Sequence, residues 1–191
     1  MKGRKLSVIT NLVLVAVVAA VSLVGFFGGN AVTVSKENSN LYYSAENGTG
    51  VSLMFNVYEH TDNVLKILDE MDEYGAKSTF FIGGSCADDN VDCVREIFKR
   101  GHEIASHGYF HKDHSRMSVD QNLEEIRPSV KLLNAICNTG ITLFAPPSGA
   151  FCEATLNACL SMDLRVIMWS RDTVDWRDKD AELIYSRATK N

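Results

Sequence analysis

The chain has 191 residues, of which 46% are hydrophobic and 23% are charged, and its formal net charge is −5. This length and hydrophobic content suffice for one domain with a sizeable core, and they exclude a disordered protein. The excess of acidic residues argues against nucleic acid as a partner.

The N-terminus combines basic residues with a long apolar run. Lys2, Arg4 and Lys5 precede residues 6–27, which carry no charge and are long enough to cross a membrane. A cleaved signal peptide has a shorter apolar centre, usually about 7 to 15 residues, so we expect an uncleaved anchor with its basic end in the cytoplasm. The sequence therefore predicts a cytoplasmic stub and anchor over residues 1–28, a linker over 29–50, and an extracytoplasmic domain over 51–191.

Beyond residue 50, short apolar runs alternate with segments of helical periodicity. The runs predict strands over residues 51–57, 78–83, 102–106, 141–145 and 165–170. Helical spacing predicts a helix with Val64 to Met71 on one face that ends near Gly75, and a second with Val91 to Phe98 inward. A capping box at Ser118 and Gln121 starts a long third helix that carries Leu123 to Leu133, and two more are predicted over residues 151–162 and 180–190. Repeated strand and helix units indicate an α/β fold with a parallel sheet or barrel, in which chemistry lies at the carboxyl ends of the strands.

Four of the five histidines fall between His102 and His114. His107 and His111 are four residues apart, a spacing that places two imidazoles on one face of a helical turn, where they could share a metal ion. By itself this spacing is more typical of a solvated loop than of a metal site. The position directly after a predicted strand favours the metal site.

Five cysteines, Cys86, Cys93, Cys137, Cys152 and Cys159, form no CxxC pair and no zinc-ribbon spacing. An oxidising compartment would permit disulfides between Cys86 and Cys93 or between Cys152 and Cys159. Buried free thiols explain the same residues equally well, and the sequence leaves both readings open.

Four sequence blocks occur in an order that resembles a known family. "TFFIGG", "GHEIASHGYFH", "FAPPSGAF" and "WSRDTVDW" are similar to the polysaccharide deacetylases with a NodB-type domain, over residues 51 to about 184. The resemblance implies a distorted (β/α) barrel that removes N-acetyl groups from sugars with a divalent metal held by two histidines and an aspartate. It assigns His107 and His111 as metal ligands and implies zinc, with cobalt or manganese as alternatives.

The chain departs from the family pattern in the first strand. The family has "TFDDG" there, with a base aspartate followed by a metal-binding aspartate, and the matching positions here are Asn56 and Val57. Asn56 can orient a water molecule but has no useful basicity. Asp62 is the candidate third metal ligand and Glu59 a weaker candidate for ligand or base; the alternative is that Asp62 only favours the first helical turn.

Two later blocks supply the remaining candidate residues. Ala145 stands where the family has arginine, and Pro147 is expected at the rim of the substrate site. In the "DTVDW" block the resemblance implies catalytic support from Asp172 and Asp175 and a sugar-pocket wall from Trp176. The family's catalytic histidine belongs to a later strand, so we expect an incomplete barrel and a fragment of a longer chain.

These observations favour a membrane-anchored deacetylase acting on peptidoglycan or chitin-like polysaccharide of N-acetylglucosamine or N-acetylmuramic acid. A carbohydrate-binding envelope protein that keeps the fold without the chemistry is the first alternative. A deacylase acting on a non-sugar amide is the second, since fold alone does not fix substrate. The oligomeric state cannot be predicted from these features.

Overall fold

The computed structural model describes residues 40–45 and 50–190. The predicted anchor and most of the predicted linker lie outside these residues. Within the described ranges, no helix has the length and apolar character needed to cross a membrane.

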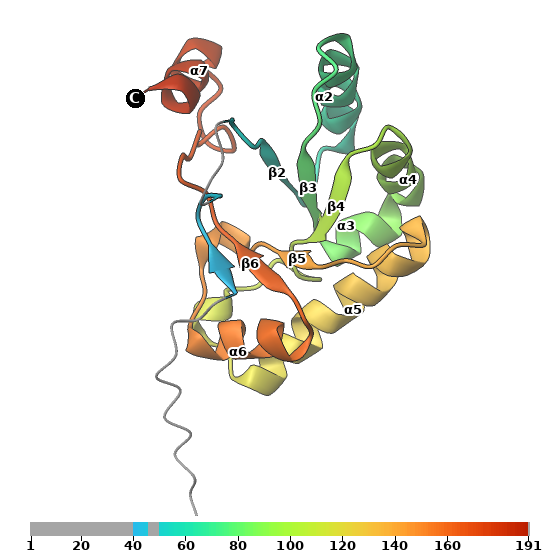
Figure 1. Ribbon diagram of the computed structural model, residues 1–191, viewed down its shortest axis with the longest axis vertical. Helices are drawn as coiled ribbons and strands as arrows, with labels where there is room; N and C mark the ends of the chain where they lie inside the picture. Colours follow the sequence, from blue (N-terminus) through green and yellow to red (C-terminus); the bar gives the residue numbers. More distant parts are fainter. Residues whose placement is uncertain (1–39, 46–49, 191) are drawn as a thin grey trace, which may run out of the picture. The chain divides into compact units, whose positions relative to one another are not determined.

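The domain is built on six parallel strands in the order β1-β6-β5-β4-β3-β2. The strands are β1 Leu41–Tyr42, β2 Met54–Val57, β3 Thr79–Ile82, β4 Glu103–Ser106, β5 Leu143–Phe144 and β6 Arg165–Ile167. Neighbours in this order are neighbours in the chain, except that β1 pairs with β6. This is the strand order of a (β/α) barrel opened between β1 and β2 (Figure 1).

The strand β1 lies within the predicted linker, residues 29–50. Leu41 and Tyr42 pair with Val166 and Ile167 of β6, and the buried amide of Asn40 donates to the carbonyl oxygen of Leu156 at 3.1 Å. Residues 40–42, which fall within the predicted linker, therefore contact the sheet that carries the domain. The sequence did not indicate this because Leu41 and Tyr42 stand among polar residues and do not form part of a longer apolar run.

The helices confirm the predicted alternation and add one element. They are α2 Thr61–Glu73, α3 Gly84–Asp89, α4 Val91–Lys99, α5 Val119–Cys137, α6 Glu153–Ser161 and α7 Ala181–Thr189. The sequence did not predict α3, whose six residues are too few to show helical periodicity. Helix α5 begins at the predicted capping box, in which the Ser118 hydroxyl accepts from the backbone N–H of Gln121.

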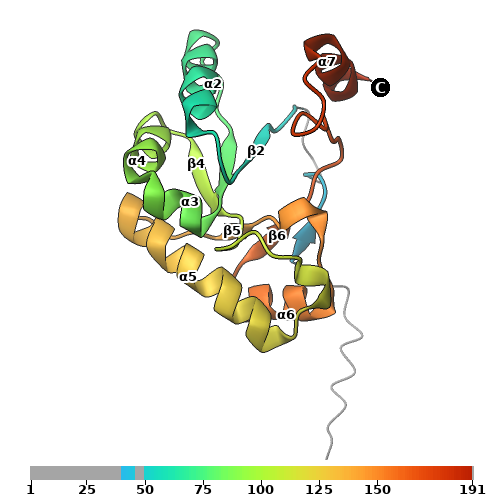
Figure 2. The same cartoon turned by 180° about the vertical axis from the view of Figure 1, so that it is seen from behind.

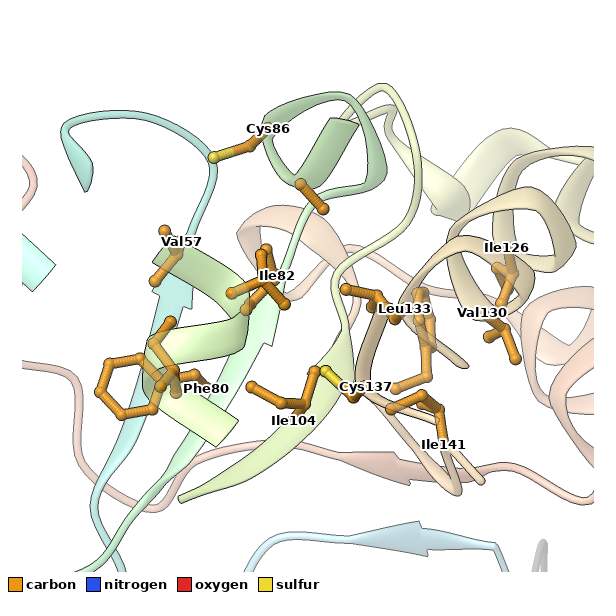
Figure 3. Packing of buried hydrophobic residues seen from close by; sticks show 14 of the residues in the cluster. Val57, Phe80, Ile82, Cys86, Ile104, Ile126, Val130, Leu133, Cys137 and Ile141 are labelled. Atoms are coloured by element: carbon orange, nitrogen blue, oxygen red, sulfur yellow. The ribbon is translucent and has the colours of Figure 1, made fainter. Parts of the chain in front are cut away.

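The larger hydrophobic cluster lies between the sheet and helices α2 to α6 (Figures 1 and 2). Phe80, Ile82 and Ile104 contribute to it from the strands (Figure 3), as does Phe144 of β5. A smaller cluster of Phe81, Ala105, Leu143 and Ala145 lies on the opposite face. Because side chains alternate along a strand, successive residues contribute to opposite clusters, and both faces of the parallel sheet are apolar.

Candidate functional site

The parallel register brings the predicted site segments to one edge of the sheet. Val57 of β2 is paired with Ile82 of β3, Ile82 with Ser106 of β4, and Ser106 with Phe144 of β5. The residues that follow these strands therefore share the carboxyl edge, where ligands bind in parallel α/β sheets. His107 directly follows β4, and its backbone N–H continues the ladder by donating to the Ile82 carbonyl oxygen at 3.0 Å.

His107 is buried and held in one tautomer. Its Nδ1 lies 2.8 Å from the carbonyl oxygen of Ala145. A carbonyl oxygen can only accept, so Nδ1 carries the proton and Nε2 keeps its lone pair. Burial, as the dominant effect, lowers the pKa of His107 to about 3, so the ring is neutral near pH 7. A neutral imidazole oriented by a backbone carbonyl is the usual form of a histidine metal ligand.

His111 lies next to His107 and lines a small cavity. The two ring centroids are 5.2 Å apart and the ring planes meet at 66°. The ring of Tyr58 is 4.9 Å from that of His111. A cavity of about 170 Å³ is lined by His111, Lys112, Asp113, Pro147, Ser148 and Ala150. The structure thus places the predicted rim residue Pro147 in the same cavity as His111.

Buried polar groups support the segment from His107 to Lys112. The carboxylate of Glu125, on α5, accepts from the backbone N–H of Phe110 and lies 3.6 Å from the ammonium of Lys112. His114 is fully buried, and its Nδ1 donates to Asn122 Oδ1 at 2.7 Å. Its Nε2 has no hydrogen-bond partner among the described residues. Burial, as the largest effect, lowers the pKa of His114 and favours its neutral form.

The first strand does not place a carboxylate beside the histidines. Asn56 is exposed, and alternation puts it on the same face as Met54 and the smaller cluster. Val57 is 6% exposed and belongs to the larger hydrophobic cluster, near Cys86 (Figure 3). The position matched to the family's metal-binding aspartate is therefore part of the core packing.

The two proposed substitutes, Glu59 and Asp62, are exposed, and no described contact joins either of them to His107 or His111. Glu59 is exposed and its carboxylate is 3.5 Å from His60 Nε2. Asp62 is exposed in the first turn of α2, where its charge adds to the burial that raises the pKa of Cys93. The helix-turn alternative for Asp62 agrees with this placement, because a carboxylate there faces the positive end of the helix dipole.

The "DTVDW" block forms an exposed loop with local contacts. Asp172 accepts from the backbone N–H of Val174 at 2.9 Å, and Asp175 accepts from the hydroxyl of Thr173. Trp176 is 78% exposed, and its role in a sugar-pocket wall stays a prediction. Its guanidinium neighbour is Arg177, 6.0 Å from the ring centroid. The described contacts thus give these side chains structural roles within the loop.

The donor set fits a metal ion only in part. The neutral ring of His107 and the adjacent ring of His111 suit a divalent cation such as zinc. Among residues 40–45 and 50–190, however, no group of three or more histidines, cysteines or acidic residues is placed to hold a metal. The described residues therefore offer two protein ligands where the resemblance implies three.

Sequence reasoning missed several groups that shape this site. The Ala145 carbonyl orients His107, although the side chain at this position gave no signal beyond the loss of an arginine. Tyr58 contacts His111, and Glu125 holds the backbone at Phe110. A buried acid on a helix face is a detectable signal, whereas a backbone carbonyl is not. The five cysteines are free thiols in the structure, including the pairs left open above.

Comparison with known proteins matches the region that contains the histidine pair to one family. The family described as "Polysaccharide deacetylase" matches residues 44–167. A peptidoglycan-N-acetylglucosamine deacetylase of Bacillus cereus is 28% identical over 145 residues, which are 76% of this chain and 53% of that protein. The peptidoglycan-N-acetylmuramic acid deacetylase PdaC of Bacillus subtilis is 28% identical over 72% of this chain and 29% of its own length. The chain thus spans about half or less of these relatives.

A solved structure has a similar fold. A CE4 family pseudoenzyme from Bacillus anthracis superimposes with a TM-score of 0.76 at 25% identity, covering 78% of this chain and 54% of that one. The relatives that resemble this chain therefore include named deacetylases and a protein named as a pseudoenzyme.

Proposed function

This chain belongs to the polysaccharide deacetylase family, and on that premise we propose that it removes acetyl groups from N-acetylated cell-wall polysaccharide of the peptidoglycan type. The reaction consumes one water molecule, breaks the acetamide C–N bond and leaves a free amine and acetate. The observation that carries the proposal is the pair of His107 and His111, 5.2 Å apart at the carboxyl edge of the sheet. Named relatives act on N-acetylglucosamine and N-acetylmuramic acid units.

His107 and His111 are the residues that would hold a divalent metal ion, with zinc as the first candidate. A bound metal would polarise the acetamide carbonyl and lower the pKa of a water molecule. The Ala145 carbonyl keeps the His107 Nε2 lone pair available by binding the proton on Nδ1. The exposed amide of Asn56 can donate a hydrogen bond to the acetyl oxygen or orient water, but it cannot accept the water's proton. We therefore expect slow hydrolysis.

A second candidate function is recognition of the same polysaccharide without hydrolysis. The first strand favours it, because Asn56 and Val57 supply neither a base nor a carboxylate ligand, and Val57 is packed in the core. In this case the edge of the sheet would bind N-acetylated sugar, and His107 would serve as a neutral polar group in the wall of the site.

The proposed substrate implies that the chain acts outside the cytoplasm. Cell-wall polysaccharide lies outside the cytoplasm, so the chain would act there, held by the apolar run over residues 6–27. This placement supports the proposed substrate and is tested by cell fractionation with protease treatment of intact cells.

Acetate release separates the two candidate functions. The purified chain is incubated with zinc and either purified peptidoglycan or an N-acetylglucosamine oligomer, and acetate is measured against time. Hydrolysis predicts release that is lost in His107→Ala and in chelator. Saturable glycan binding with no acetate at any zinc concentration would support recognition alone and would rule out the deacetylase.

A further inference from the structure

Two glycines after β3 provide space for two tyrosine rings. Gly83 has φ −68° and ψ 137°, values that any residue adopts, so its backbone does not require glycine. A Cβ added at Gly83 would overlap Cδ2 of Tyr58 and lie 3.1 Å from Cε2. A Cβ added at Gly84 would overlap the ring of Tyr109 in the same way. Gly83 is therefore needed because the Tyr58 ring occupies the space of a side chain.

Tyr58 makes two further contacts from this position. Its hydroxyl accepts a hydrogen bond from Ser85 Oγ at 3.1 Å. Its ring centroid is 4.9 Å from that of His111, with the planes at 46°. The ring is thus seated on Gly83, bonded at its tip to Ser85, and in contact with His111 on the loop after β4.

His111 needs such a contact. Its φ of 54° lies in the left-handed region, which is costly for a residue with a side chain. Neighbouring groups must hold this backbone conformation, or the imidazole would leave its place beside His107. Glu125 holds the backbone at Phe110, one residue earlier, but it does not contact the His111 ring in any described interaction. The ring of Tyr58 supplies that contact.

We propose that Tyr58 is the positioning residue for His111: seated in the space left by Gly83 and bonded to Ser85, its ring holds the His111 imidazole beside that of His107. Tyr58 acts on the histidine pair from a strand end that has lost the family's carboxylates. The proposal concerns the placement of His111 and holds whether the chain hydrolyses polysaccharide or only binds it.

Substitutions at Tyr58 test the contact directly. Tyr58→Leu removes the aromatic ring and keeps an apolar side chain, whereas Tyr58→Phe keeps the ring and removes only the bond to Ser85. The chain is labelled with 13C-histidine, and the His111 ring protons are assigned by their loss in His111→Gln. We expect the ring-current shift and the nuclear Overhauser contact between His111 and His107 to be retained in Tyr58→Phe and lost in Tyr58→Leu.

The two glycines provide matched control variants. Gly83→Ala should displace the Tyr58 ring and remove the ring-current shift of His111. Gly84→Ala acts on Tyr109 and should leave the His111 shift unchanged. Because the overlap in Gly83→Ala opposes folding, its effect on the free energy of unfolding is also measured in the Tyr58→Leu background. A seated ring predicts that the two substitutions are non-additive, with a smaller cost of Gly83→Ala once the ring is gone.

Three results would overturn the proposal. The first is an unchanged His111 shift and His107 contact in Tyr58→Leu. The second is an equal effect of Gly84→Ala and Gly83→Ala on His111. The third is strict additivity of Gly83→Ala and Tyr58→Leu. A purely structural role for Tyr58 would lower stability in Tyr58→Leu without changing the nuclear Overhauser contact between His111 and His107. This contact separates the two roles, because the ring-current shift is lost whenever the Tyr58 ring is removed.

Discussion

The carboxylate of Glu125 offers the sharpest test of how the site loop is held. Glu125 is 2% exposed on α5, accepts from the backbone N–H of Phe110 and lies 3.6 Å from the Lys112 ammonium. Glu125→Ala removes a charged hydrogen bond, worth roughly 1.5–3 kcal/mol, and leaves a small cavity. The Lys112 side chain is 53% exposed, so its ion pair adds little. We expect a loss of about 2–4 kcal/mol in the free energy of unfolding.

Urea unfolding of three variants measures this effect. Glu125→Gln keeps an acceptor of the same shape for Phe110 and should cost about 1 kcal/mol. Glu124→Ala alters an exposed neighbour on the same helix and should cost less than about 0.5 kcal/mol. Hydrogen exchange at the Phe110 amide should become faster only in Glu125→Ala. A cost of Glu125→Ala equal to that of Glu124→Ala, with unchanged exchange, would refute the reasoning.

Three further predictions concern the first strand, the buried histidine and a core thiol. Asn56→Asp changes an exposed residue, so it should lower the free energy of unfolding by less than about 0.5 kcal/mol and, by supplying a base, raise acetate release at least roughly tenfold. Val57→Asp buries a charge in the core and should lower the free energy of unfolding by more than about 2 kcal/mol. Equal losses in the two variants would contradict the packing of Val57. Burial lowers the folded-state pKa of His107 from 6.5 to about 3, so the unfolded chain binds the proton first as the pH falls. The free energy of unfolding should therefore drop by about 2 kcal/mol between pH 7 and pH 5. In pH-dependent urea unfolding, His107→Gln should reduce this dependence, and an equal dependence would count against a neutral buried ring. Burial raises the pKa of Cys159 to about 12, so a thiol reagent at pH 8 should label Cys159 only when the chain unfolds. Rapid labelling of Cys159 in the folded chain would contradict its burial.

The regular elements could be predicted from the sequence, whereas the contacts that build the site could not. Within the described residues, short apolar runs located five of the six strands and helical periodicity located five of the six helices; the Ser118 capping box marked the start of α5. Strand β1 was missed because Leu41 and Tyr42 stand among polar residues, and helix α3 because six residues are too few for a periodic pattern.

The candidate site divides in the same way. The four-residue spacing grouped His107 with His111, and position after different strands grouped His111 with Pro147, because the carboxyl ends of parallel strands meet at one edge. The role of Asp62 as a third ligand stays a prediction; the structure places it, exposed, in the first turn of α2. Contacts across the edge, such as the Ala145 carbonyl on His107 and the Tyr58 ring on His111, depend on strand register and have no local sequence signal.

The central claim is that the edge carrying His107 and His111 receives an N-acetylated sugar. Imidazole NMR spectra of the 15N-histidine-labelled chain, recorded during titration with an N-acetylglucosamine oligomer and with the same oligomer after chemical deacetylation, test it most directly. The account predicts that the His107 and His111 signals shift with the acetylated oligomer and not with the deacetylated one, while exposed His60 is unaffected by either. Equal responses to the two oligomers, or shifts confined to His60, would contradict it.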